Sequence, residues 1–342
     1  MTYNNPNING SNWSELNILE SLRKKNPLVI CITNDVVRTF TANGLLAIGA
    51  SPVMSECSED LKDLIVHASA LLINIGTVTP DKVTYYKEAV KLAKAHEVPI
   101  ILDPVGCHSG AYRLSVVLDL IKTGAISLLR GNQSEIKAIY DALNTNHKID
   151  SSLSGKGVDG EQVEDSAIIT YRLARQINCP VVATGEEDYV SDGTRVFAVP
   201  HGHSIMTAVT GTGCLLGAVL AAFFSSYYPF MDNLSIGEFL AYALAYYGLA
   251  GESAVKARGV KPGNFSVAFL DALYEFDDAM LLSENRIRPV VVPDQLKVYF
   301  ISGTQDVGFN ERHLLDTVEA ACRGGVTCFQ FREKGIGTLE GQ

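Results

Sequence analysis

Clusters of basic residues, paired cysteine motifs and long hydrophobic runs are all missing from this sequence. Lysine and arginine number 28 against 38 aspartates and glutamates, which gives a formal net charge of −10. We therefore expect no nucleic-acid-binding surface. The longest apolar run, residues 214–224, is well short of the ~20 residues of a membrane-spanning helix. The polar N-terminus also lacks the apolar segment of a signal peptide, so we expect no membrane attachment.

The seven cysteines form no CxxC pair and show no spacing typical of a zinc site. An odd number of cysteines without such pairing is typical of free thiols in a reducing compartment. We therefore predict a cytoplasmic protein. The pair His201-x-His203 has no third candidate ligand near it in sequence, so we interpret it as a surface or supporting pair rather than a metal site.

Hydrophobic residues make up 47% of the 342 residues, enough for a large α/β core and a smaller second part. Short apolar runs alternate with helical patterns from residue 28 to residue 184, which predicts a parallel sheet covered by helices on both faces. The expected strands are 28–33, 70–75, 98–103, 126–129 and 180–184. A hairpin is expected over 189–199, because Asp-Gly is a strong turn signal, and helices follow from residue 214.

Polar residues lie at or just after the ends of several of these expected strands. They comprise two asparagines, two carboxylates, an arginine and a threonine: Asn34, Asn74, Asp103, Arg130, Glu135 and Thr184. Ligands of open parallel sheets bind beyond the carboxyl ends of the strands, so we expect these side chains to share one rim. Each alone would be an ordinary turn or cap, but together they suit phosphoryl transfer, which depends on positioning and charge neutralisation.

A glycine- and threonine-rich stretch, Val209-Thr-Gly-Thr-Gly-Cys214, precedes a strongly apolar helical run. Glycines allow backbone N–H groups to approach a ligand, and a helix N-terminus adds unpaired donors and partial positive charge. The stretch therefore suits a phosphate or a developing negative charge. The field of the helix is expected to favour a thiolate at Cys214. A tight loop entering a core helix, with Cys214 as an ordinary buried residue, is the local alternative.

Six motifs in order carry a specific resemblance: CITNDVVRTFTANGLLAIGASPVM, LLINIGT, ILDPVG, LLRGNQSEI, VVATGEEDYVSDG and VTGTGC. They resemble the hydroxyethylthiazole kinases of the ribokinase-like superfamily. The resemblance implies a three-layer α/β domain with a parallel sheet over residues 13–285. It also implies in-line phosphorylation of 4-methyl-5-(2-hydroxyethyl)thiazole in thiamine biosynthesis and salvage, with ATP as co-substrate and Mg²⁺ as cofactor. Family members form homotrimers with sites at subunit interfaces.

The same resemblance assigns roles to individual residues. It implies Met54 and Gly211 at the substrate, Arg130 and Thr184 at ATP, Asp103 and Glu135 near Mg²⁺, and Cys214 as the catalytic residue. Cys214 stands where most ribokinase-like relatives carry an aspartate base. Whether its sulfur takes the proton or only positions the alcohol stays open. The run Glu186-Glu187-Asp188 is more acidic than the family pattern suggests beside a triphosphate.

Two other functions remain as alternatives. A ribokinase-like kinase could act on another small alcohol of the hydroxymethylpyrimidine or pyridoxine type, although Met54 in its SPVM motif favours thiazole. A non-catalytic nucleotide-binding scaffold is the other alternative. The intact set of Asp103, Arg130, Glu135 and Cys214 favours an enzyme.

Beyond the kinase-like region, we expect a linker over residues 286–296, where prolines and valines cluster. Residues 297–342 predict an incomplete βαβ unit, which resembles the start of thiamine-phosphate synthase, a TIM-barrel enzyme. Gln330, Arg332 and Lys334 match the motif with which that family binds a pyrimidine diphosphate. A barrel needs roughly 200 residues or more, so we expect no synthase activity from this segment.

Overall fold

The computed structural model describes residues 16–144, 165–296, 299–324, 326 and 328–332. They fall in two compact units that divide after Val290. The first unit contains the predicted kinase-like region, apart from residues 13–15 and 145–164, which lie outside the described residues. Each unit is considered by itself below.

A nine-stranded sheet organises the first unit, in the order β2-β1-β3-β4-β5-β6-β7-β8-β9. Neighbouring strands from β2 to β6 are parallel, and β7, β8 and β9 are added antiparallel at one edge. The strands are β1 Leu28–Ile32, β2 Ser51–Met54, β3 Ala70–Asn74, β4 Ile100–Asp103, β5 Ile126–Asn132, β6 Val181–Thr184, β7 Asp188–Ser191, β8 Val196–Val199 and β9 Arg288–Val290. All five predicted parallel strands and the predicted hairpin are confirmed.

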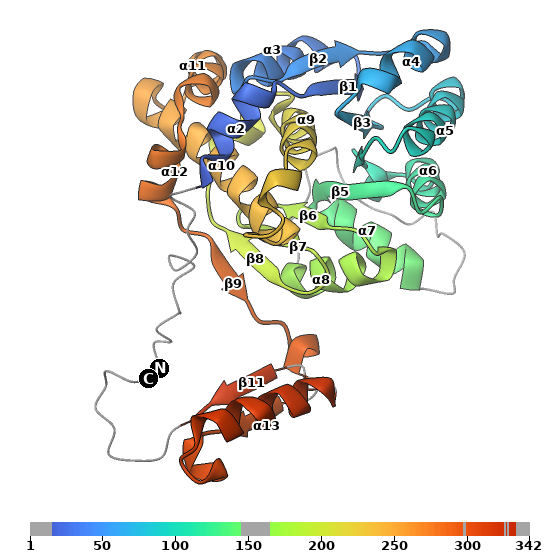
Figure 1. Ribbon diagram of the computed structural model, residues 1–342. Coiled ribbons are helices and arrows are strands. Elements are labelled where there is room, and N and C mark those ends of the chain that lie inside the picture. The colour runs from blue at the N-terminus through green and yellow to red at the C-terminus, as the bar shows by residue number, and fades with distance from the viewer. Residues whose placement is uncertain (1–15, 145–164, 297–298, 325, 327, 333–342) are drawn as a thin grey trace. The chain divides into compact units, whose positions relative to one another are not determined.

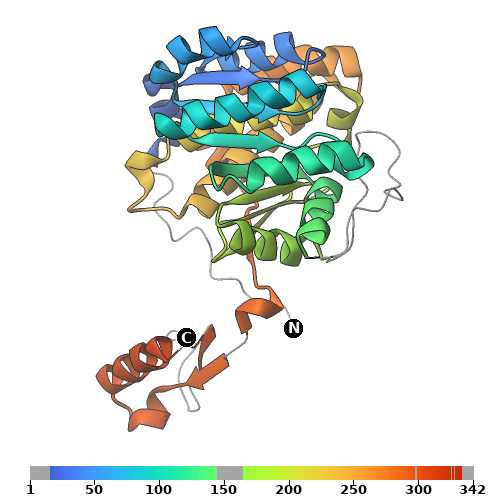
Figure 2. The ribbon, with the colours of Figure 1, turned by 90° about the vertical axis from the view of Figure 1, so that its right-hand side faces the viewer.

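Helices cover the sheet on both faces, which makes three layers (Figures 1 and 2). One face carries α2 Ile18–Lys25, α3 Arg38–Ile48, α9 Thr212–Ser225, α10 Ile236–Arg258, α11 Pro262–Glu275 and α12 Asp278–Glu284. The other carries α4 Ser58–Leu64, α5 Pro80–Ala95, α6 Ala111–Ile121, α7 Gln133–Asn144 and α8 Ser166–Ile177. Strand residues alternate between the two cores, because successive side chains of a strand point to opposite faces. In β1, for example, Val29 joins the first core and Ile30 the second.

Two strands of this sheet were not predicted. The strand β2 is short and contains Pro52, and a proline argues against a central strand, so the pattern gave no strand signal there. The structure places β2 at the sheet edge beside β1, where a proline is tolerated. The strand β9 falls inside the predicted linker, which is a correction: residues 288–290 pair with β8. A three-residue strand around Pro289 has too few residues to show a period.

Six of the cysteines are free thiols, namely Cys31, Cys57, Cys107, Cys179, Cys214 and Cys322. Among the described residues, no helix combines the length and the apolar character that a membrane crossing requires.

The second unit contains β10 Tyr299–Ser302, α13 Glu311–Arg323 and β11 Cys328–Phe331. The two strands are parallel neighbours, and Phe300 contacts Phe329 across them with ring centroids 5.7 Å apart. The predicted strand–helix–strand order of this segment is confirmed. Its resemblance to a synthase stays a prediction.

The contact between α10 and the segment after β8 leaves no room for an added methyl group. A Cβ on Gly248 would lie 2.6 Å from Cβ of His201 and 2.7 Å from its carbonyl carbon. We expect Gly248→Ala to lower the free energy of unfolding by about 1–3 kcal/mol, because overpacking forces backbone shifts. Urea unfolding measures the change.

Gly263 in α11 is the matched control, because no atom lies within 4 Å of the Cβ it would gain. Gly263→Ala is expected to leave stability unchanged or raise it by up to about 1 kcal/mol. Equal effects of the two substitutions would contradict the close packing of α10 on His201.

Candidate active site

The polar residues predicted at strand ends do share one rim of the sheet. Asn74 ends β3 directly opposite Asp103, which ends β4. Asn132 ends β5 opposite Thr184, which ends β6, and Arg130 lies two residues earlier in β5. The parallel register alone therefore brings side chains from four strands to the same edge.

Arg130 is the link between the central strands of this rim. Its Nη1 lies 3.6 Å from Oδ1 of Asp103, and its Nη2 donates to Oγ1 of Thr184 at 2.9 Å. Both members of the ion pair are buried. Oδ2 of Asp103 accepts a hydrogen bond from Nδ2 of Asn74 at 2.8 Å, whereas Oδ1 has no hydrogen-bond partner. This buried oxygen is therefore held only by the ion pair with the guanidinium.

Glu135 is held by backbone amides at the start of α7. Its two carboxylate oxygens accept from the N–H groups of Gly106 and Asn132, both at 2.7 Å. In return, Oδ1 of Asn132 accepts from the N–H of Glu135 at 2.8 Å. This reciprocal pattern is that of a capping box, and it fixes the carboxylate in place. Glu135 is thus buried and oriented before any ligand binds.

Cys214 lies in the first turn of α9, next to the asparagines of the rim. Asn34 Nδ2 donates to Asn74 Oδ1 at 3.1 Å and approaches Sγ of Cys214 at 3.5 Å. The preceding Gly211 has φ 98°, a conformation that favours glycine. A Cβ there would also lie 3.1 Å from Cγ1 of Val37. The loop before α9 therefore approaches the segment after β1 as closely as glycine permits.

The pKa of Cys214 corrects one prediction. The helix field was expected to favour a thiolate, but burial, followed by the negative charge of Asp103, raises the pKa of Cys214 to about 11. Hydrogen bonds from Asn74 and Asn34 and the charge of Arg130 oppose this rise without cancelling it. The sulfur is therefore a neutral thiol near pH 7.

The two carboxylates also hold protons more tightly than usual. Burial raises the pKa of Asp103 to about 6, against the opposing effects of Arg130 and Asn74. Burial and then the charge of Asp103 raise the pKa of Glu135 to about 7. Burial alone would lower the pKa of Arg130, but the neighbouring carboxylates outweigh it and the pKa is raised. The rim carries more negative charge than Arg130 compensates, which favours the binding of a cation.

The structure does not gather all the predicted site residues at one point. Met54 ends β2, five strands from Thr184 in β6, so about 24 Å of sheet separates their strands at about 4.8 Å per spacing. Asp103 and Cys214 lie between these ends. Gly211 packs near Val37 and Phe40, on the β1 side. The rim is thus long enough for two ligands that meet near its centre.

Several residues of the site were missed or underrated. Asn34 and Asn74 were visible at strand ends, but the contact of Asn34 with Cys214 was not predictable because it joins segments 180 residues apart. Tyr247 lies in a tyrosine-rich stretch that reads as core packing, and its buried hydroxyl donates to the carbonyl of Thr212 at 2.5 Å. Half-buried Asp188 accepts from the N–H of Gly185 at 2.9 Å. Its charge adds to those that raise the pKa of Arg130.

Other candidate residues lie elsewhere. His201 contacts Glu252 and Arg286, and Nδ1 of His203 caps the short helix that begins at Ser204. Among the described residues, no group of three or more histidines, cysteines and acidic residues could hold a metal by itself. Gln330 and Arg332 are exposed in the second unit, and Lys334 lies outside the described residues.

Comparisons with known proteins agree on one family. Residues 19–279 match the Hydroxyethylthiazole kinase family. The chain is 48% identical to hydroxyethylthiazole kinase of Streptococcus agalactiae serotype Ia over 267 residues, which are 78% of this chain and 99% of that protein. The structure of hydroxyethylthiazole kinase protein from Pyrococcus horikoshii OT3 matches with a TM-score of 0.70 at 34% identity, over 80% of this chain and 98% of that one.

A more distant structure shows only the fold. A ribokinase-like superfamily protein from Enterococcus faecalis V583 matches with a TM-score of 0.50 at 14% identity, over 75% of this chain and 93% of that one. The predicted ribokinase-like architecture is confirmed for the first unit. None of these matches addresses the second unit.

The raised pKa values of Asp103 and Glu135 predict how stability changes with pH. Ordinary carboxyl groups titrate near pH 4, so between about pH 4 and pH 7 the folded protein binds more protons than the unfolded chain. The stabilisation is fully present below about pH 4 and is lost as the pH rises through 6 and 7. We expect the melting temperature of the nucleotide-free protein to rise when the pH is lowered from 8 to 5.5.

The variant Asp103→Asn/Glu135→Gln isolates this effect from the general loss of negative charge at low pH. Its melting temperature should change less over the same range in calorimetry. An unchanged slope in the double variant would show that these two carboxyl groups do not carry the dependence.

Proposed function

Because this chain belongs to the hydroxyethylthiazole kinase family, it phosphorylates the hydroxyl of hydroxyethylthiazole with ATP, and we propose that the transfer takes place around Asp103, Arg130 and Cys214. The match over 99% of a relative's length supports a whole kinase domain. The observation that carries the proposed site is the continuous contact series from Cys214 through Asn34, Asn74 and Asp103 to Arg130.

The β5–β6 side of the rim is the proposed ATP end. Arg130 cannot lose its proton at ordinary pH and is held by Thr184, so it offers a fixed positive charge to the phosphates. The hydroxyl of Thr184 is a second polar contact at the same place. The loop from Gly211 to Gly213 leads into α9, whose first-turn backbone N–H groups would receive the transferred phosphoryl group. The N–H of Thr212 is not among them, because it donates to the carbonyl of Val209.

The β1–β2 side is the proposed thiazole end. Met54 supplies a polarisable apolar wall for a sulfur heterocycle, and the backbone of Gly211 closes the site near Val37 and Phe40. The strand order places this end away from Thr184, so a nucleotide and a small alcohol can approach the centre from opposite sides.

The donor atoms of the rim fit Mg²⁺ that arrives with the nucleotide. Oδ1 of Asp103 makes no hydrogen bond beyond its 3.6 Å ion pair with Arg130, and it is a hard oxygen ligand. Glu135 lies close enough to Asp103 for the charge of Asp103 to raise the pKa of Glu135. Mg²⁺ is commonly bound by one or two carboxylates together with substrate phosphates, so a three-residue cage is not required. When bound, Mg²⁺ would neutralise charge on the phosphates. Asp103 and Glu135 would hold it.

Cys214 is proposed to orient the substrate alcohol rather than to remove its proton. A pKa near 11 leaves the sulfur protonated, and the amides of Asn34 and Asn74 face it from the rim. Phosphoryl transfer through a loose transition state needs little base strength, so positioning is sufficient for a contribution to rate. Of the two roles that the sequence left open for Cys214, proton removal and positioning of the alcohol, we therefore propose positioning.

A cytoplasmic homotrimer is the proposed state of the protein. The free thiols of the described cysteines agree with a reducing compartment. Large apolar side chains are exposed on two helices that pack together, Leu46 on α3 and Val267 on α11, which supports a subunit contact there. The proposed substrate and ATP residues all belong to the first compact unit of the chain.

Coupled ADP release tests the function on a panel of alcohols. We expect turnover with hydroxyethylthiazole and little with hydroxymethylpyrimidine or pyridoxine. Preferred turnover of a pyrimidine or pyridine alcohol would assign a different substrate to the same fold. The second unit is expected to add no synthase activity, which a condensation assay with thiazole phosphate and pyrimidine diphosphate checks.

The variant Cys214→Ser tests the role of the thiol. We expect ATP affinity within about twofold of the parent and turnover lowered by roughly tenfold, less than the 10²–10⁴-fold expected for loss of a general base. The pH profile of turnover should show no thiol ionisation between pH 6 and 9, because the pKa lies near 11. Unchanged turnover would make Cys214 a packing residue.

Cys214→Asp is the complementary variant, because it supplies a carboxylate base at the same position. If the alcohol only needs orientation, this change gives no gain at neutral pH. A large gain in turnover with a new acidic inflection would instead show that proton removal limits the parent enzyme.

A further inference from the structure

Residues 285–290 form a strap that lies beyond the family match at 19–279 and yet belongs to the kinase sheet. Its strand β9 pairs antiparallel with β8, with Ala198 opposite Arg288. Ile287 is buried in the same core as α9 and α10. The buried Ile287, with Arg286 before it and Arg288 after it in the sequence, therefore anchors the strap to the core beside the sheet.

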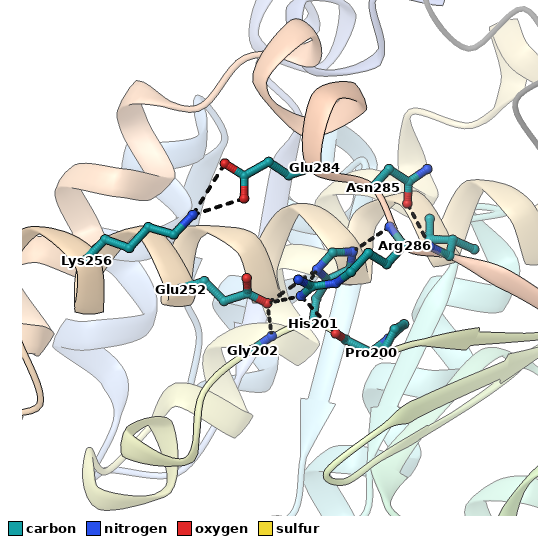
Figure 3. A network of polar contacts seen from close by, with 9 residues as sticks. Pro200, His201, Gly202, Glu252, Lys256, Glu284, Asn285 and Arg286 are labelled. Carbon is teal, nitrogen blue, oxygen red and sulfur yellow. Dashed lines mark hydrogen bonds and ion pairs between the residues drawn. The ribbon is translucent and has the colours of Figure 1, made fainter.

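Arg286 attaches the first end of the strap to the segment after β8, as Figure 3 shows. Its Nη2 donates to the carbonyl of Pro200 at 3.0 Å and contacts Glu252 of α10, and its backbone N–H donates to Nε2 of His201 at 3.0 Å. Glu252 also accepts from the N–H of Gly202 at 3.0 Å. Residues 200–202 lead into the loop before α9. By holding them, the strap fixes the path by which the chain enters that loop.

Arg288 attaches the strap to the turn after β6. Its Nη2 lies 2.7 Å from both carboxylate oxygens of Glu187, and the hydroxyl of Tyr189 donates to the same carboxylate at 2.7 Å. The carbonyl of Glu187 accepts from Nε2 of Gln133 at 3.0 Å. The turn at 185–187 directly follows Thr184, at the proposed ATP end.

We propose that Arg288 is a positioning residue for ATP, which acts through Glu187 on the turn after β6. This inference rests on the proposed ATP end of the site. The run Glu186–Asp188 is acidic beside a ligand that is itself anionic, and Arg288 supplies an opposite charge to its central residue. The strap thereby holds the turn beside Thr184 and reduces its repulsion of the phosphates.

The ion pair that carries this role is partly exposed, at 47% for Arg288 and 23% for Glu187, so a moderate effect is expected. In the full chain, Arg288→Met should raise the KM for ATP about threefold to fivefold and leave the KM for hydroxyethylthiazole unchanged. Arg288→Lys keeps the charge and should restore part of the loss.

Arg195 is the matched control. It forms a similar surface pair with Glu238, with Nη–Oε distances of 2.9 and 3.1 Å and 50% exposure of the arginine. It lies in the turn between β7 and β8, at the opposite end of β7 from Asp188 and the ATP side. Arg195→Met should therefore leave the KM for ATP unchanged.

Two measurements separate this inference from the proposed function. Calorimetric titration with a non-hydrolysable ATP analogue reports nucleotide affinity without any thiazole turnover. Hydrogen exchange of a peptide covering 184–190 reports the turn itself, and it should be faster in Arg288→Met and unchanged in Arg195→Met. Absence of thiazole phosphorylation in the parent would contradict the function alone.

Any of three kinetic results would overturn the positioning role. They are an ATP KM within twofold of the parent in Arg288→Met, an equal rise in Arg195→Met, and a parallel rise of both substrate KM values. Faster exchange of the turn without any change in ATP affinity would also reject it, because the strap would then be structural only.

Discussion

The buried ion pair between Asp103 and Arg130 is the constraint on which the rest of the rim depends. Burying two charges costs free energy unless each finds further polar partners. Each member meets only part of this need. Arg130 donates to Thr184 while its Nε has no hydrogen-bond partner, and Asp103 accepts from Asn74 through Oδ2 while Oδ1 has only the ion pair. The partners come from neighbouring parallel strands, so the sheet order β3-β4-β5-β6 is what makes the pair possible. The incompletely bonded Asp103 and the excess negative charge are the features on which the proposed binding of a metal-bound nucleotide rests.

Much of the fold and part of the site follow from sequence pattern, for reasons that individual residues illustrate. The short apolar run at 98–103 predicts a buried strand that ends in a carboxylate, and the structure has a strand over Ile100–Asp103 with that carboxylate at the rim. The short strands around Pro52 and Pro289 show no periodic hydrophobic pattern, because their place in the sheet is decided by pairing with the neighbouring strand. The raised pKa of Cys214 also could not be predicted, because it results from burial and from the charge of Asp103, which is far away in the sequence.

A neutral thiol at the start of α9 changes how the loop before it should be understood. The helix N-terminus offers N–H groups to an anion, and a thiolate at Cys214 would compete for the same positive field. A protonated sulfur leaves that field to the phosphoryl group. In the proposed site, the loop, Tyr247 bonded to it and the asparagines beside it would together place an alcohol and a phosphate in line.

The strand β9 also affects how the sheet behaves toward other proteins. An open sheet edge is a template for pairing with another chain, and aggregation often begins there. The outermost strand is only three residues long, and its central Pro289 has no N–H to offer a further strand. Any mutation that detached β9 would uncover the buried strand β8, with Val196, Phe197 and Val199 along it. The same short segment thus limits edge-to-edge pairing with another chain on this side of the sheet.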